Sequence, residues 1–108
     1  MDFCEAIAAK IAEYDADAAD GDVPGFDAWD RAARDYLEDV RKRLLAGEDA
    51  ASVYARLKDE LPRLEELVEA EEACYTFDWY DDHHYIKIYS GQVQACKAAL
   101  ALYEACVG

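Results

Sequence analysis

The sequence predicts a mainly α-helical single domain, α-rich α+β in class, with four to five packed helices and a β-hairpin near residues 74–89. Three observations support this. The length of 108 residues suits one domain spanning 1–108. Apolar residues make up 54% of the chain and mostly recur at helical spacing, which argues against global disorder despite a net charge of -14. Residues 74–89 instead are aromatic and β-branched.

The first predicted helix covers residues 3–18, where Asp2 and Glu5 resemble a capping box. Turn-forming residues over 20–25 end it. A second helix begins after Asp27 and stops at Gly47, which acts as a C-terminal cap. The apolar stripes of the two helices are Cys4, Ile7, Ala8, Ile11 and Tyr14, and Trp29, Ala33, Tyr36, Leu37, Val40 and Leu44.

A third helix begins near Asp49, and Pro62 lies inside its apolar stripe. Proline removes a backbone donor and crowds the preceding turn, so we expect either a kink or two helices that meet near Leu61. The stripe consists of Val53, Leu57, Leu61, Leu64 and Val68.

The predicted hairpin pairs residues 74–80 with residues 85–89 across a turn at 81–84, and the final helix then starts after Ser90. In the competing interpretation the final helix extends backwards, because Tyr85, Tyr89 and Val93 also fit helical spacing. Gly91 weighs against that extension, since glycine is a poor helix former.

The cysteine pattern and the absence of a membrane segment favour a cytoplasmic protein of a bacterial or phage-infected host cell. The four cysteines show no metal-binding spacing, and we expect them to be reduced: Cys4, Cys74, Cys96 and Cys106. No apolar run reaches about 18 residues, and no basic, apolar leader follows Met1.

Acidic residues are distributed unevenly along the chain. Residues 1–30 carry a net charge of -8, residues 31–63 of +1, and residues 64–108 of -7. In the balanced second helix, opposite charges recur at four-residue spacing and predict local ion pairs: Arg31 with Asp35, Arg34 with Glu38, Glu38 with Lys42, and Asp39 with Arg43. The flanking segments therefore hold the excess negative charge.

Two rows of carboxylates and one aromatic segment form the predicted partner-binding surface. The rows repeat at helical spacing on the first and third helices, with charges about 5–6 Å apart along each axis. Trp79 and Tyr80 point to opposite sides of a predicted strand, so at least one is expected near solvent as an interface anchor. The full set is Glu13, Asp17, Asp20, Asp22, Glu65, Glu69, Glu72, Asp78, Trp79, Tyr80, Asp81 and Asp82.

No motif in the sequence predicts catalysis, a metal or a cofactor. The one concentration of metal-ligand types is Asp78, Asp81, Asp82, His83 and His84, in which adjacent histidines do not easily face one ion. No nucleophile, phosphate loop or dinucleotide fingerprint stands out. We therefore predict no catalytic residues, no metal and no cofactor.

No motif identifies a family. In its length, acidity and acidic helical rows the chain resembles, as a class, small inhibitors that mimic nucleic acid, such as anti-CRISPR, anti-restriction and nuclease-immunity proteins. The resemblance is compositional and implies no functional residue. It implies a basic nucleic-acid-binding protein as partner, such as a nuclease or CRISPR effector, without direct contact to nucleic acid or membrane.

Four alternatives accompany this hypothesis. Acidic helix surfaces commonly serve only solubility, and a salt-loving host would also favour acidic residues. An acidic helical adaptor or homodimer subunit would bind through its apolar and aromatic surface instead. A small enzyme ranks third among the functional interpretations.

Overall fold

The computed structural model describes residues 2–20, 26–73 and 84–107, without the side chains of residues 17–20, 26–28, 84–85 and 107. This part of the chain forms four α-helices: α1 (Phe3–Asp20), α2 (Phe26–Leu45), α3 (Ala50–Ala73) and α4 (His84–Val107). No strand occurs within these ranges. The fold is therefore all-helical, as far as it is described.

Local sequence signals explain how several helices begin and end. The carboxylate of Asp2 accepts a 2.7 Å hydrogen bond from the amide of Glu5, which confirms the predicted cap of α1. Gly47 has a φ of 99°, its amide bonds to the carbonyl of Leu44 at 3.1 Å, and the amide of Glu48 bonds to that of Arg43 at 3.1 Å. These two bonds are the Schellman arrangement, so the predicted glycine cap is also confirmed.

The predicted β-hairpin is wrong where it can be compared, because residues 84–89 form the first turns of α4. Its other strand, residues 74–80, lies outside the described residues. Gly91 is a poor helix former, yet it lies within α4, where a Cβ would lie 2.5 Å from the carbonyl oxygen of Trp29. Glycine therefore occupies this helical position because α4 passes directly against the backbone of α2, and the tertiary contact outweighs its poor helix propensity.

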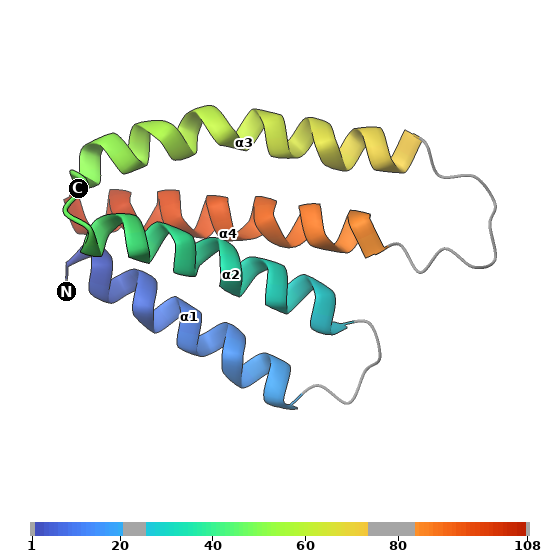
Figure 1. The fold of residues 1–108 in the computed structure, drawn as a ribbon, viewed down its shortest axis with the longest axis horizontal. Helices are drawn as coiled ribbons and strands as arrows, with labels where there is room; N and C mark the ends of the chain where they lie inside the picture. Colours follow the sequence, from blue (N-terminus) through green and yellow to red (C-terminus); the bar gives the residue numbers. More distant parts are fainter. Residues whose placement is uncertain (1, 21–25, 74–83, 108) are drawn as a thin grey trace.

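Pro62 lies within α3, so the alternative of two helices meeting near Leu61 is also wrong. The ribbon runs through this position as one arched helix (Figure 1).

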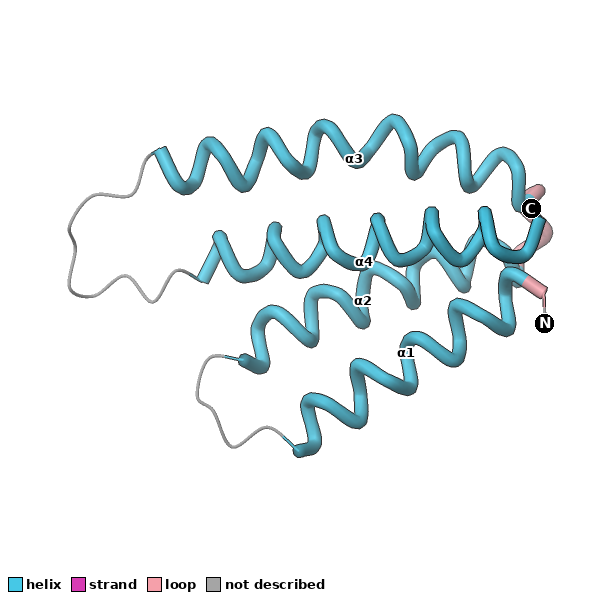
Figure 2. The backbone as a smooth tube through the Cα atoms, turned by 180° about the vertical axis from the view of Figure 1, so that it is seen from behind, coloured by secondary structure: helices cyan, strands magenta, loops and turns pink. Residues whose placement is uncertain are grey.

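Across the molecule the helices follow the order α3, α4, α2, α1, as Figures 1 and 2 show from opposite sides. α2 and α4 pack most extensively against each other, α1 packs on α2, and α3 packs on α4. Both chain ends lie at one end of the bundle, while α3 and α4 project beyond α1 and α2 at the other (Figure 1). α1 and α3 are thus the outer helices.

The predicted apolar stripes meet in one core, which confirms the helical periodicity. Its buried members are Phe3, Ile7, Ile11, Tyr14, Ala33, Leu37, Val40, Val53, Leu57, Ala95, Cys96 and Ala99. A pair of aromatic rings in edge-to-face contact closes each end of the core. The ring centroids of Phe3 and Tyr103 lie 5.3 Å apart, and those of Tyr14 and Trp29 lie 5.9 Å apart. None of the four described helices combines the length and apolarity that crossing a membrane requires.

Candidate protein-binding surface

The two predicted acidic rows differ in how the structure presents them. On α1, Glu13 is exposed but forms an ion pair of 3.1 Å with Lys10. Asp17 and Asp20 belong to α1, although their side chains are outside the described part, as is Asp22 entirely. The α1 row is therefore partly neutralised at the position that can be examined.

The row on α3 is exposed along its whole length, and two further glutamates lie in the same segment on other faces of the helix. We call residues 64–73 the acidic segment; it contains Glu65, Glu66, Glu69, Glu71 and Glu72 and no base. Four of these side chains are exposed, and that of Glu71 is partly exposed. Within the described part of the chain, none of the five forms an ion pair or side-chain hydrogen bond.

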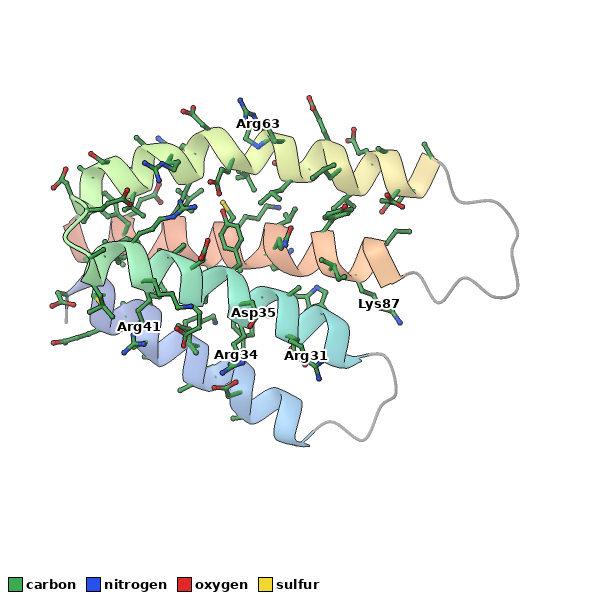
Figure 3. All side chains as sticks on the ribbon, viewed as in Figure 1. Arg31, Arg34, Asp35, Arg41, Arg63 and Lys87 are labelled. Carbon is green, nitrogen blue, oxygen red and sulfur yellow. The ribbon has the colours of Figure 1, made fainter. Side chains whose placement is uncertain are left out.

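The position of the acidic segment strengthens its negative potential. It forms the C-terminal end of α3, where the helix dipole is itself negative and no basic residue occupies the last turn. The nearest bases in sequence point elsewhere in Figure 3: Arg63 extends outward from α3, and Lys87 extends from the side of α4 opposite α3. Carboxylates at this helix end repel one another and the dipole.

The aromatic anchors predicted beside the rows cannot be compared, because Asp78, Trp79, Tyr80, Asp81 and Asp82 lie outside the described residues. The structure instead exposes Leu67, at 41%, in the middle of the acidic segment. The sequence could have indicated this exposure, because Leu67 lies one position outside the predicted apolar stripe, which passes through Leu64 and Val68. On the helix surface its neighbours at three and four residues are Arg63, Leu64, Ala70 and Glu71, so one carboxylate lies directly beside it.

Many of the described acids elsewhere form ion pairs within the fold. Asp15 of α1 forms an ion pair of 2.6 Å with Arg34 of α2, and Glu60 of α3 forms an ion pair of 3.8 Å with Arg43 of α2. Of the four pairs predicted within α2, the structure forms that of Arg43 with Asp39, at 3.7 Å. The others fail because inter-helix partners and neighbours at other spacings compete; Arg34, for example, reaches across to α1.

Asp30 is one of the acids that give residues 1–30 their negative charge, yet it is 2% exposed and belongs to the core face of α2. The spacing of Asp30, Ala33, Leu37 and Val40 could have revealed this, since it places the four on one helical face.

A polar cluster links three helices near the centre. The phenol of Tyr36 donates a 2.5 Å hydrogen bond to Glu60, and the thiol of Cys96 donates a 3.3 Å hydrogen bond to the carbonyl of Leu57. Burial first, and then hydrogen bonds to Cys96 and Glu60, raise the pKa of Tyr36. Burial likewise raises the pKa of the Cys96 thiol. Both groups therefore stay protonated at neutral pH, and we interpret the cluster as structural.

Among the predicted reduced cysteines, Cys4, Cys96 and Cys106 are free thiols. Cys96 is buried as expected, Cys4 is half-buried and Cys106 is exposed, so only one packs fully as a small hydrophobe. Cys74 lies outside the described residues.

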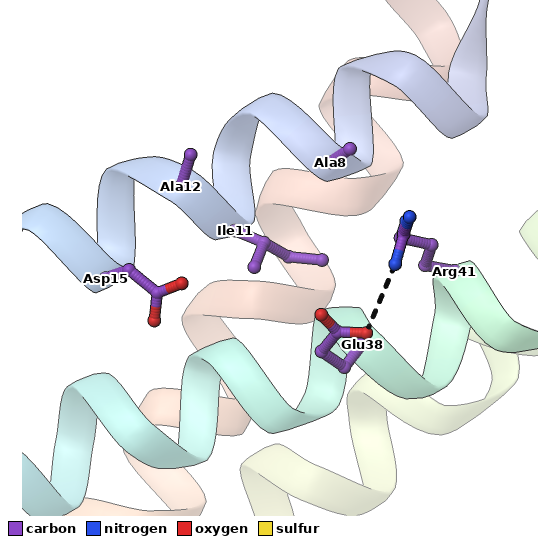
Figure 4. A pocket seen from close by; sticks show the side chains of 6 residues that line it. All are labelled: Ala8, Ile11, Ala12, Asp15, Glu38 and Arg41. Atoms are coloured by element: carbon purple, nitrogen blue, oxygen red, sulfur yellow. Dashed lines mark ion pairs between the residues drawn. The ribbon is translucent and has the colours of Figure 1, made fainter.

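A shallow depression lies between α1 and α2 (Figure 4). It has a volume of about 210 Å³ and is lined by Ala8, Ile11, Ala12, Asp15, Glu38 and Arg41. This is smaller than the roughly 300–1,000 Å³ of most ligand sites. Its carboxylates already pair with bases, Asp15 with Arg34 and Glu38 with Arg41 at 3.7 Å. The depression therefore offers no free charge to a ligand.

In the portion of the chain that is described, no group of three or more His, Cys, Asp or Glu side chains is arranged to hold a metal ion. Comparisons with protein-family models, curated proteins and solved structures gave no match for this chain. Its function is therefore inferred from surface chemistry alone, in which the acidic segment is the most distinctive feature.

Proposed function

We propose that this protein binds a basic, nucleic-acid-binding protein and blocks its nucleic-acid site. The observation that carries this proposal is the acidic segment, whose five carboxylates are all solvent-accessible and unneutralised within the described structure. Most described acids outside this segment form an ion pair or a hydrogen bond. Glu5, Asp49 and Asp59 do not, but they are isolated, so a run of unpaired carboxylates is a feature of the acidic segment within the described chain.

The charge density of the acidic segment is close to that of a nucleic-acid strand. Five carboxylates over ten residues of helix correspond to one charge per about 3 Å of axis. A strand of B-form DNA carries one phosphate per about 3.4 Å of axis. A groove lined by Lys and Arg to hold a phosphate strand therefore offers complementary charge to this helix end.

The same charge excludes direct binding to DNA or RNA and supports fast recognition of a basic protein. With a net charge of -14, long-range attraction would steer such a partner toward the surface. Occupying the groove would then displace the nucleic acid it normally holds. This mechanism would place the protein among the inhibitors of nucleases and CRISPR effectors or among the nuclease-immunity proteins.

Leu67 gives the surface a second component. Its exposed side chain lies beside Glu71 and on the opposite side of α3 from Glu65, Glu69 and Glu72, so it would supply an apolar contact at the edge of the charged interface. An adaptor that binds mainly through apolar surface would depend on Leu67, or on Leu45, which is 64% exposed. The two functions thus differ in which side chains dominate binding.

Capture of bacterial proteins on immobilised protein tests the proposal with three matched baits. The first is wild type, and the second is the α3-row variant E65Q/E69Q/E72Q. The third is a control, D35N/D39N/E48Q, which removes the same number of charges from another surface. Bound proteins are eluted with a short DNA duplex and identified by mass spectrometry.

We expect DNA to elute nucleic-acid-binding proteins from wild type and control, but not from the row variant. Affinity for a purified partner should fall steeply with rising salt, because surface charges act through screened attraction. Equal capture by all three baits would contradict the proposal. Capture that is insensitive to salt and lost in Leu67→Ala would identify an apolar adaptor instead.

A further inference from the structure

Helix α3 changes character at Pro62. Before it, Val53 and Leu57 are fully buried, and Tyr54 donates a 2.6 Å hydrogen bond to Glu104 of α4. Glu60 receives the hydrogen bond from Tyr36. Within residues 62–73 no residue is buried, and no side chain makes a hydrogen bond or ion pair to the described chain. Beyond Pro62, α3 packs only through partly buried side chains such as Leu64, so the contacts that hold it in place become weaker there.

Helix α4 changes in the same way at Gly91. From Gly91 onward it contributes buried residues to the core, including Val93, Ala95, Cys96 and Ala99. Residues 86–90 are all half-buried instead. The two transitions divide this helix pair into a packed body and a less packed end.

The two transition points lie at the same height along the bundle. α3 and α4 run antiparallel (Figure 1), and the Cys96 thiol meets the Leu57 carbonyl at 3.3 Å. Pro62 follows Leu57 by five residues, and Gly91 precedes Cys96 by five residues. At about 1.5 Å per residue, both positions therefore lie about 7.5 Å beyond that contact.

Both transition residues weaken their helices. Proline lacks the amide that would bond to the carbonyl of Lys58 and its ring crowds that carbonyl, at a cost of about 3 kcal/mol in a helix interior. Glycine costs about 1 kcal/mol relative to alanine. The close approach of Gly91 to the Trp29 carbonyl holds α4 against α2 at this height. Each helix is thus weakest where its tight packing ends.

The geometry points to a hinge at the level of Pro62 and Gly91, about which the α3–α4 tip moves against the body of the bundle. We define the tip as residues 62–73 and 84–90. Its far end projects beyond α1 and α2 in Figure 1, and it includes the acidic segment. A hinged tip can adapt its carboxylates to the shape of a basic groove; this use of the motion, but not the motion itself, rests on the proposed function.

Residual dipolar couplings of backbone amides in the weakly aligned, isotope-labelled full chain test the hinge. Such couplings average over the microsecond-to-millisecond range in which hinge motions occur. The alignment magnitude fitted to residues 64–73 should be smaller than that fitted to residues 53–61, while carbon chemical shifts remain helical in both. Pro62→Ala restores the missing hydrogen bond and should bring the two magnitudes together.

Glu65→Gln combined with Glu69→Gln is the matched control, because it removes repulsion but keeps the proline. Reduced alignment should persist in it. Equal alignment of both halves in wild type would overturn the hinge, as would coil-like shifts over 64–73, which indicate fraying rather than motion of an intact helix. Since no partner is present, a rigid tip would leave the proposed binding function standing, and failed binding would leave the hinge standing.

Discussion

The two halves of α3 use their charged residues in opposite ways. Residues 50–61 pack against both neighbours, and Glu60 is engaged by Tyr36 and Arg43 of α2. The acidic segment lies beyond these contacts and keeps five carboxylates without a partner in the described structure. In this protein, acids that lie between helices connect those helices, whereas surplus acids gather where a helix leaves the body of the bundle.

This difference implies that stability and binding reside in separate halves of one helix. A substitution in the first half should act mainly on folding, and one in the acidic segment mainly on association. The following four measurements test that separation.

The largest contrast is expected between two leucines of α3. Leu57 is fully buried, so Leu57→Ala should lower the free energy of unfolding by about 2–5 kcal/mol through lost burial and a cavity. Leu67 is 41% exposed, and Leu67→Ala should change that free energy by only about 0.5 kcal/mol. Urea denaturation measures both. Similar losses would show that the acidic segment is packed as firmly as the first half.

Gly91→Ala tests whether α2 and α4 are in close contact at the height of the proposed hinge. An added Cβ would meet the Trp29 carbonyl at 2.5 Å, so we expect a loss of stability. Overpacking typically costs about 1–3 kcal/mol, against a helix-propensity gain of about 1 kcal/mol. Thermal unfolding beside the exposed-site control Gln94→Ala gives the sign. A higher melting temperature for Gly91→Ala would mean that α2 and α4 are not in close contact.

Tyr36→Phe removes the hydrogen bond between α2 and Glu60 and should cost about 1–2 kcal/mol. The pKa of Tyr36 is raised in the folded state, chiefly by burial, so its contribution is present below the ordinary phenol pKa of about 10 and is lost as pH rises above it. Wild type should therefore lose more stability than Tyr36→Phe in alkaline denaturation. Parallel alkaline curves for the two proteins would exclude this role for Tyr36.

The smallest effect on stability is expected in the acidic segment itself. E65Q/E69Q/E72Q removes like-charge pairs and unfavourable contacts with the helix dipole, so stability should hold or rise by about 0.5–1 kcal/mol at low salt. High salt should remove the gain by screening. Denaturation at two salt concentrations checks this, with D35N/D39N as a control that should not gain. A clear loss would mean that these glutamates support the fold.

Local sequence patterns predict most of the helical residues, the start of α1 and the end of α2. Helical spacing of apolar residues predicts the core positions of α1 and α2, and Gly47 predicts the cap of α2, because these are interactions between residues near in sequence. The α3 row was likewise predictable, since residues three and four apart share one helical face. Its exposure in the structure agrees with that pattern.

Contacts between helices determine which of the local preferences prevail. Residues 84–89 are helical although their composition suits a strand, because α4 packs along α2 and Gly91 lets their backbones meet. Arg34 of α2 reaches Asp15 of α1 through a distance between two helices that the linear sequence does not encode. Helix propensity and ion pairing within a helix contribute free energies of about 1 kcal/mol or less. The free energy of packing between helices is larger, so packing prevails where the two disagree.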